Sequence, residues 1–377
     1  MSEPEEFVER LLARVLADTH RHQRGVTASG GFAVGEPPAA RRRLANAVVA
    51  VMGRVGFTRR RFAPEQAAGV LTAAIELADG LARTEELLAD ARSRELMLTV
   101  FSLRALGSGH VKLPVSEWAF NQECARIDRD LRVIEDAARS PLDLPLHRYE
   151  LRGRHGPVAV LGLAFMVQEF FVREQYALRR DGVRIEAQPG DVVVDGGGGW
   201  GETALYFADA VGTGGRVLCF EFVPENLRLL DLNLAANPGL RERIEVIEHP
   251  LWESSGEQLE YTVHGGESSL VWEGPERDRA RTESLDEACR KHGVPRVDFL
   301  KLDVEGAELA ALRGAEEVIR RSRPKLAVSV YHHEADFVEI PGWIDDLGLG
   351  YELFLDHKSP GPAETILFAR TPRSADR

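Results

Sequence analysis

The sequence has few cysteines, no long apolar run and a deficit of positive charge. Its three cysteines, Cys124, Cys219 and Cys289, are odd in number and widely separated, so they give neither a disulfide framework nor the spacing of a zinc site. This pattern suits a reducing cytoplasm, which is the location we expect. The longest apolar run, near Val158 to Val167, is too short to span a bilayer, so we expect no membrane partner.

The 377 residues carry a net charge of −13 at neutral pH. Such a surface repels phosphate backbones, so we expect no nucleic-acid partner. The chain is long enough for two or three domains, and a hydrophobic content of 44% suffices for a packed core. Composition does not set the oligomeric state, and a homo-oligomer stays open.

The first third of the chain spaces its apolar residues as helices do and contains no motif with an assignable chemistry. Predicted helices cover residues 5–18, 41–55, 64–91, 92–106 and 117–139, with a Gly-, Ala- and Pro-rich loop at 26–40, short strands at 147–151 and 158–163, and a helix at 168–180. We therefore predict a mainly helical domain over residues 1–145, serving substrate recognition or oligomerisation, and a second domain over residues 146–377.

From residue 190 onward, strands and helices alternate, which predicts a parallel sheet covered on both faces. The predicted strands are 191–195, 216–221, 243–248, 297–303 and 325–331, and the helices 201–211, 224–236, 283–292 and 306–321. Two further strand-like runs, 351–356 and 364–369, are joined by a loop too short for a helix, so they should form an antiparallel hairpin. The predicted class is α/β, with a Rossmann-like sheet.

A glycine-rich turn organises this second domain. Asp195 ends an apolar run, and Gly196, Gly198 and Gly201 follow in the spacing G-x-G-x-x-G before a helical pattern. Glycines let the backbone approach a ligand closely, and a helix N-terminus offers free N–H groups. A second apolar run ends at Glu221, 20 residues after Gly201, where nucleoside-binding folds have the carboxylate that binds ribose.

The same glycine spacing occurs in dinucleotide-binding dehydrogenases, so an NAD(P)-dependent oxidoreductase is one alternative. Three features favour S-adenosylmethionine. Asp195 precedes the turn, where a carboxylate accepts hydrogen bonds from the amino acid end of that ligand but would repel a pyrophosphate. The nucleotide half follows a helical region and closes with a hairpin. The fourth strand ends in Lys301-Leu-Asp303-Val-Glu305-Gly-Ala-Glu308.

Five stretches are distinctive: Asp195 to Gly201, Phe220 to Glu225, Val297 to Glu308, Tyr331-His332, and Glu364 to Ala369. Together they resemble the FkbM-type S-adenosylmethionine-dependent methyltransferases, over roughly residues 165 to 370. The resemblance implies a class I methyltransferase fold and, usually, O-methylation of a hydroxyl in natural-product biosynthesis. We therefore expect a methyltransferase whose acceptor is a small molecule such as a sugar, a glycoside or a polyketide-like compound. A non-catalytic nucleotide-binding scaffold is the second alternative.

Each motif then has a predicted role. The predicted cofactor-binding residues are Asp195, Gly196, Gly198, Gly201, Glu221, Phe222, Leu251 and Tyr176. Asp303 follows the fourth strand, at the edge where open α/β sheets bind ligands, and is predicted to orient or deprotonate the acceptor. His332 stands where the family motif has a histidine, and a neutral imidazole is a suitable general base. Capping of the next helix is the structural alternative for Asp303.

A divalent ion is a further candidate cofactor. Asp303 together with His332, Glu334 or Asp336 could hold Mg²⁺, which would acidify a bound hydroxyl. The spacing alone does not define a metal site, so no metal-ligating residue is assigned.

Overall fold

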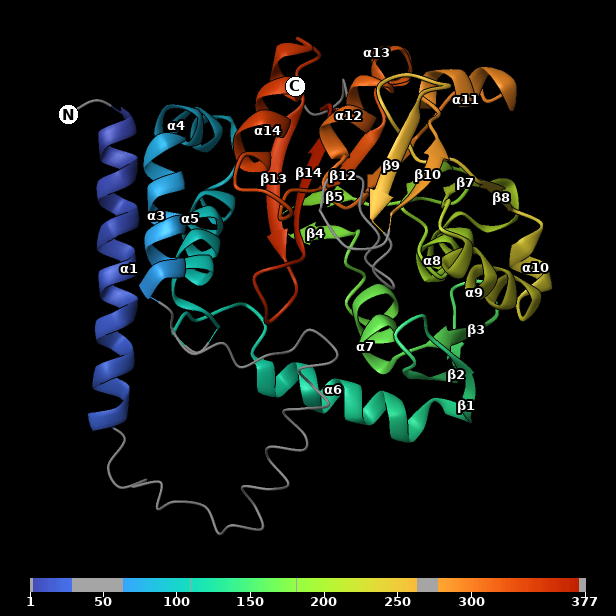
Figure 1. The fold of residues 1–377 in the computed structure, drawn as a ribbon, viewed down its shortest axis with the longest axis horizontal. Coiled ribbons are helices and arrows are strands. Elements are labelled where there is room, and N and C mark those ends of the chain that lie inside the picture. Colours follow the sequence, from blue (N-terminus) through green and yellow to red (C-terminus); the bar gives the residue numbers. More distant parts are fainter. Residues whose placement is uncertain (1–2, 29–63, 109, 181, 263–276, 373–377) are drawn as a thin grey trace.

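The computed structural model describes residues 3–28, 64–108, 110–180, 182–262 and 277–372 (Figure 1). The predicted helix over 41–55 lies outside these residues, as does most of the predicted loop over 26–40. Residues 26–28 belong instead to the first helix, α1.

A seven-stranded sheet in the order β13-β14-β12-β11-β6-β7-β8 forms the centre of the fold. Its strands are β6 (Val192–Gly196), β7 (Arg216–Phe220), β8 (Ile244–Ile247), β11 (Phe299–Leu302), β12 (Lys325–Ser329), β13 (Glu352–His357) and β14 (Thr365–Arg370). The five from β12 to β8 are parallel, and β14 runs antiparallel to both β12 and β13. The predicted α/β sheet and its terminal hairpin are thus confirmed.

Helices cover both faces of this sheet. They are α8 (Glu202–Val211), α9 (Pro224–Ala235), α10 (Pro238–Arg241), α11 (Leu285–Lys291), α12 (Glu308–Arg313), α13 (Glu316–Ser322) and α14 (Asp336–Asp346). The predicted single helix over 306–321 is divided near Gly314. A Cβ on Gly314 would lie 2.0 Å from the backbone oxygen of Trp252, so the chain can pass this close to its neighbour only as glycine.

The predicted helix over 117–139 is wrong in its second half. Helix α6 covers Glu117–Asp130, and strand β1 (Arg132–Arg139) follows it directly. Strand β1 pairs with β2 (Pro145–Arg152), which pairs with β3 (Pro157–Gly162), so strand pairing overrides the helical spacing. The predicted domain boundary between residues 145 and 146 falls within β2 of this small sheet.

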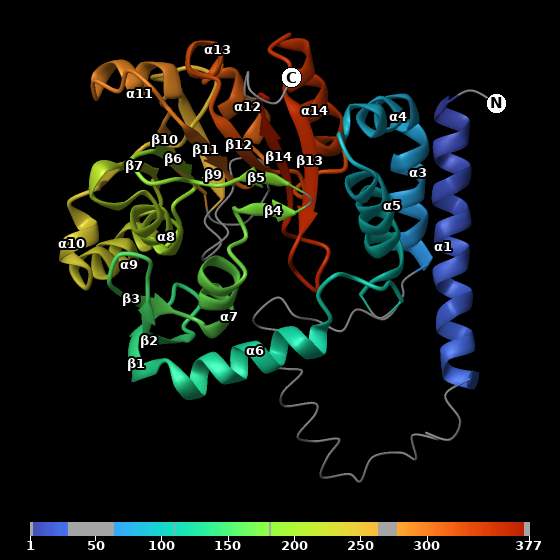
Figure 2. The same cartoon turned by 180° about the vertical axis from the view of Figure 1, so that it is seen from behind.

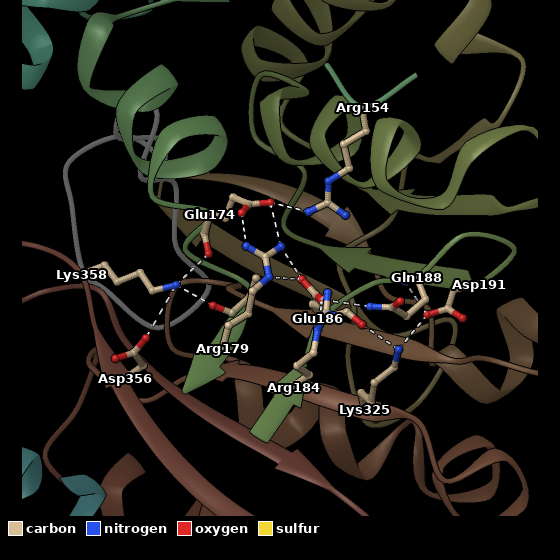
Figure 3. A network of polar contacts seen from close by, with 11 residues as sticks. Arg154, Glu174, Arg179, Arg184, Glu186, Gln188, Asp191, Lys325, Asp356 and Lys358 are labelled. Atoms are coloured by element: carbon tan, nitrogen blue, oxygen red, sulfur yellow. Dashed lines mark hydrogen bonds and ion pairs between the residues drawn. The ribbon is translucent and has the colours of Figure 1, made fainter. Parts of the chain in front are cut away.

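The predicted helix over 168–180 is also wrong. A short helix α7 (Ala164–Val167) continues into a π-helical turn (Gln168–Val172), and β4 (Leu178–Arg180) then pairs with β5 (Val183–Ile185). The chain reverses at Glu174, whose φ of 48° is left-handed. Figure 3 shows why this turn is stable: Arg179 lies between the carboxylates of Glu174 and Glu186, and Lys358 donates to the Glu174 backbone oxygen at 2.9 Å.

Four N-terminal helices pack along the β13 edge of the sheet and against α14 (Figures 1 and 2). They are α1 (Glu3–Ala28), α3 (Pro64–Glu76), α4 (Ala78–Leu87) and α5 (Ala91–Leu106). The segment between α4 and α5 and the first turn of α5 are partners of the edge strand, since Ala89 N donates to Leu353 O at 2.8 Å and Leu355 N donates to Ser93 Oγ at 2.9 Å. A single apolar core extends from Phe7 of α1 into the sheet. None of the helices in the described ranges combines the length and the hydropathy that a bilayer crossing requires.

Candidate active site

Strand register brings three of the predicted residues to one edge of the sheet. Gly196, at the end of β6, pairs with Phe220 of β7 on one side and with Leu302 of β11 on the other. The next residues along those strands, Glu221 and Asp303, therefore flank the glycine turn from both sides. This edge is the carboxyl end of the parallel strands, where open α/β sheets bind ligands.

The glycine turn has no room for side chains at its second and third glycines. A Cβ on Gly197 would lie 1.9 Å from the Asp303 backbone oxygen, and one on Gly198 would lie 2.2 Å from the Cys219 sulfur. Gly201, the residue before α8, has a φ of 94°, which favours glycine. The turn therefore presents bare backbone at the start of a helix, which is the arrangement that the predicted cofactor site requires.

Asp195 is buried beneath this turn, and its partner is Lys301, a residue without a predicted role. Lys301 Nζ lies 3.0 Å from Asp195 Oδ1 and donates to the backbone oxygens of the first two glycines at 3.0 and 2.6 Å. Thr203 Oγ1 donates to Asp195 Oδ2 at 2.7 Å. Burial alone would lower the pKa of Lys301, but the charges of Asp195 and Asp303 outweigh it and raise that pKa. A buried ion pair thus supports the shape of the turn.

Glu202, at the start of α8, is a second buried acid beside the turn. Only 2% of it is exposed, and within the described part of the chain its Oε1 has no hydrogen-bond partner. Burial, reinforced by the charge of Asp195, raises the pKa of Glu202 to about 8. At neutral pH the folded, ligand-free protein therefore keeps this carboxyl largely protonated.

We expect the protonation of Glu202 to make the protein less stable as the pH rises. Its ordinary pKa is 4.5 and its folded value about 8, so its stabilising contribution is complete below 4.5 and is lost as the pH passes through 8. The loss is on the order of 4 kcal/mol. Urea unfolding of the ligand-free protein between these pH values should show this decline, and Glu202→Gln should flatten it. Glu225→Gln, which changes an exposed acid on α9, is the control. Parallel pH profiles for Glu202→Gln and the wild type would contradict the assignment.

Glu221, the predicted ribose ligand, is buried at the end of β7. Its Oε1 accepts hydrogen bonds from Phe222 N at 2.6 Å and Val223 N at 2.8 Å, and its Oε2 accepts one from Asn226 Nδ2 at 3.3 Å. Burial raises the pKa of Glu221, while these donors act in the opposite direction. The carboxylate is thus oriented by the start of α9 and keeps acceptor capacity on Oε2.

Leu251 and Phe222, two further predicted cofactor-binding residues, contact the glycine turn and the residues after β7. Leu251 is 2% exposed and packs beneath the turn, since a Cβ on Gly196 would lie 2.9 Å from Leu251 Cδ1. The partly exposed Phe222 packs edge-on against Tyr261, with 4.9 Å between ring centres. Tyr261 belongs to an antiparallel ribbon of β9 (Gln258–Thr262) and β10 (Arg277–Arg281), which the sequence did not predict.

Asp303 is held by two tyrosines. Tyr176 donates its hydroxyl to Oδ2 at 2.7 Å, and Tyr331 donates to Oδ1 at 2.9 Å. Burial alone would raise the pKa of Asp303, but the charges of Lys301 and His332 lower it below the ordinary value. Asp303 is therefore ionised at neutral pH. Tyr176, predicted to cover the cofactor, is 1% exposed and has its hydroxyl directed at this carboxylate.

His332 lies among three carboxylates at the carboxyl end of β12. Its Nδ1 is 3.1 Å from Glu308 Oε1, and its Nε2 is 3.3 Å from Glu305 Oε2 and 3.8 Å from Asp303 Oδ1. Burial alone would lower the pKa of His332, but these acids, Glu308 foremost, raise it to about 11. A protonated imidazole has no lone pair that can accept a proton. This charge state does not fit the general-base role that we predicted for His332.

The motif Asp-x-Glu-Gly-Ala-Glu builds the turn beside His332. Glu308, fully buried, accepts hydrogen bonds from Val304 N at 2.7 Å and Gly306 N at 3.1 Å. Between these two residues, Glu305 has a φ of 57°, a left-handed value that is unusual for a side chain of this size. Such backbone strain is common at functional sites, where the surroundings hold it in place.

Three residues without a predicted role also reach this edge. Glu364 has a φ of 71°, accepts a hydrogen bond from the Gln175 side chain, and has its pKa raised to about 8 by burial and by Asp303. Arg104 of α5 donates to the Tyr331 backbone oxygen. Tyr331 itself is the third. Tyr331 and Glu364 both lie in quoted motifs, whereas nothing around Arg104 in the sequence distinguishes it from a surface arginine.

The proposed Mg²⁺ ligands Glu334 and Asp336 are not brought to this cluster. Glu334 Oε1 lies 3.3 Å from Arg104 Nη1, and Asp336 Oδ2 accepts a hydrogen bond from His333 N at 2.7 Å. Within the described residues, the ligand atoms of Asp303, Glu308 and His332 lie instead within 4.8 Å of one another.

Comparisons with known proteins agree with this geometry. Residues 182–353 match the family model described as the methyltransferase FkbM domain. No curated protein matches the sequence. Among solved structures, the methyltransferase FkbM from Methylobacillus flagellatus KT matches with a TM-score of 0.50 and 18% identity, over 79% of this chain and 60% of that one. The chain thus spans less than two thirds of that protein's length.

Two further solved structures match with lower scores. A S-adenosylmethionine-dependent O-methyltransferase from Thermotoga maritima has a TM-score of 0.33 and 16% identity, over 59% of this chain and 77% of that one. Aeropyrum pernix fibrillarin with bound S-adenosyl-L-methionine has a TM-score of 0.34 and 18% identity, over 64% of this chain and 99% of that one. The family match leads to one conclusion: residues 182–353 of this chain form an FkbM-type methyltransferase domain.

Proposed function

We propose that this protein transfers the methyl group of S-adenosylmethionine to a hydroxyl of a small-molecule acceptor, such as a sugar, a glycoside or a polyketide-like compound. One observation carries the proposal: Glu221 and Asp303 flank the same glycine turn at the carboxyl edge of the sheet. A nucleoside extended along this edge would have its ribose at Glu221 and its methionine end at the turn. The net charge of −13 supports a small acceptor over a nucleic acid.

The main contribution of the protein to this reaction is to align the acceptor oxygen with the methyl group. The sulfonium methyl is already electrophilic, so the protein has to hold the acceptor oxygen in line behind it. Asp303 is ionised and fixed by two tyrosine hydroxyls. It accepts a hydrogen bond from the hydroxyl of the methyl acceptor and then takes up the proton of that hydroxyl. Without a bound cation, the positive charge of His332 lowers the pKa of Asp303 and so stabilises its ionised form.

Glu221→Ala tests the cofactor site directly. We expect this change to weaken S-adenosylmethionine binding by about 1–3 kcal/mol, because a carboxylate that accepts hydrogen bonds from ribose hydroxyls is lost. Titration calorimetry measures the loss of affinity. A thermal melt checks that the variant is still folded, because Glu221 also orients the beginning of α9. Glu225→Ala, which removes an exposed acid four residues along, should bind as the wild type does. Unchanged affinity in Glu221→Ala would remove Glu221 from the site.

The same calorimetry separates the proposal from an oxidoreductase. Wild-type protein should bind S-adenosylmethionine and not NAD; the opposite result would overturn the proposal. Incubation with S-adenosylmethionine and a panel of glycosylated and polyketide acceptors should then yield products heavier by one CH₂ group. Cofactor binding without turnover on any acceptor of the panel would favour the non-catalytic scaffold.

A further inference from the structure

The cluster around His332 combines several metal-ligating side chains. Asp303, Glu308 and His332 each offer one ligand atom, and these atoms lie within 4.8 Å of one another. They come from two neighbouring strand ends, β11 and β12, and from the first residue of α12. The predicted set with Glu334 and Asp336 is different, because those two side chains have other partners.

The imidazole of His332 lacks the hydrogen bonds that a buried polar ring normally makes. Only 2% of its side chain is exposed, and neither ring nitrogen has a partner in hydrogen-bond geometry among the described residues, although carboxylates lie nearby. Buried polar groups without hydrogen bonds are uncommon and call for an explanation. A ligand between the ring and the acids would supply one.

The local charge fits a cation. The three acids Asp303, Glu305 and Glu308 contact His332, while the nearby Lys301 is already paired with Asp195. Negative charge thus exceeds positive charge among these groups. Glu305 Oε2, 3.3 Å from Nε2, adds a third carboxylate beside the ring.

We propose that Asp303, Glu308 and His332 form a binding site for a divalent transition-metal cation such as Mn²⁺. Binding would displace the proton that the imidazole of His332 otherwise carries, because only a neutral imidazole ligates a metal. Two carboxylates with one imidazole favour such an ion over Mg²⁺, which prefers oxygen ligands and retains its waters. The ion would lie at the carboxylate to which we assign the acceptor hydroxyl, where a Lewis acid promotes ionisation of that hydroxyl. The site adds a cofactor to the proposed function, but its metal binding does not depend on methyl transfer.

Metal binding can be measured without S-adenosylmethionine or an acceptor. Full-length protein treated with a chelator and exchanged into metal-free buffer is titrated with Mn²⁺, by calorimetry and by the loss of the free-ion electron paramagnetic resonance signal. We expect one Mn²⁺ per chain and weaker binding of Mg²⁺. Asp303→Asn and His332→Gln should each weaken Mn²⁺ binding by about tenfold or more.

His333→Gln is the matched control, because it changes the adjacent histidine, which is not part of the three-residue group. It should bind Mn²⁺ as the wild type does. If His332→Gln does not fold, Asp303→Asn decides, because Asp303 is partly exposed. The proposal is overturned if the wild type binds no Mn²⁺ at millimolar concentration, or if both ligand variants bind it unchanged. A protein that binds S-adenosylmethionine but no Mn²⁺ loses this proposal and keeps the proposed function.

Discussion

Asp303→Asn should reduce methyl transfer by about 10²- to 10⁴-fold while S-adenosylmethionine affinity stays within a few-fold of the wild type. The asparagine keeps the size of the side chain, and its one oxygen can still accept from one of the two tyrosine hydroxyls, but it cannot take up the acceptor's proton. Initial rates with the best acceptor of the panel, together with calorimetry of cofactor binding, measure the two quantities separately.

Tyr331→Phe is the matched control for Asp303→Asn. It removes one of the two hydroxyls that hold Asp303 and leaves the carboxylate in place, so we expect a smaller loss of turnover. Equal losses of cofactor affinity and turnover in Asp303→Asn would show that this residue binds the cofactor and does not act on the acceptor.

Lys301→Met should destabilise the protein by about 3–5 kcal/mol, because it leaves Asp195 as a buried charge without its cation. Lys301 is 1% exposed and its ammonium also satisfies two backbone oxygens of the glycine turn. Urea unfolding at neutral pH measures the loss. The double variant Lys301→Met with Asp195→Asn should recover part of it, since neither partner then carries a buried charge.

Lys325→Met tests whether burial causes this effect. Lys325 on the adjacent strand β12 also forms an ion pair, with Asp191 at 2.8 Å, but a quarter of its side chain is exposed. An exposed pair of this kind contributes about 1 kcal/mol or less. If Lys301→Met costs no more than Lys325→Met, or if the double variant is as unstable as the single one, Asp195 does not depend on Lys301 for its stability in the core.

Strands β6, β7 and β11 were predictable because each is a short, mostly apolar run that ends at or just before a glycine or an acid. Val192 to Val194 are apolar on both faces of the sheet, as buried parallel strands are, so the sequence shows them clearly. Strand β1 was missed because Val133 and Ile134 also fit a helical spacing, and only its pairing with β2 makes it a strand. The ribbon containing Tyr261 has no comparable apolar run, since β10 reads Arg-Asp-Arg-Ala-Arg.

The acids of the site were predictable from their positions at strand ends, but their partners were not. Lys301 occupies a motif position, yet its pairing with Asp195 comes from the register of β11 against β6, which the sequence does not display. The charge of His332 was missed for a similar reason. An isolated histidine titrates near neutrality, and only the packing of Glu305 and Glu308 around it shows that this one does not.

The N-terminal helices cover the outer edge of strand β13, and this matters for truncated forms of the protein. The backbone of β13 pairs with β14 on one side, and on the other Leu353 and Leu355 bond to the segment before α5 and to the first turn of α5. A shortened version starting at α6 would expose a row of unsatisfied amides and carbonyls beside the apolar residues that α5 now shields. Exposed strand edges of that kind pair with other copies of the chain and lead to aggregation. The amino-terminal helices would therefore protect the sheet of the methyltransferase fold from aggregation.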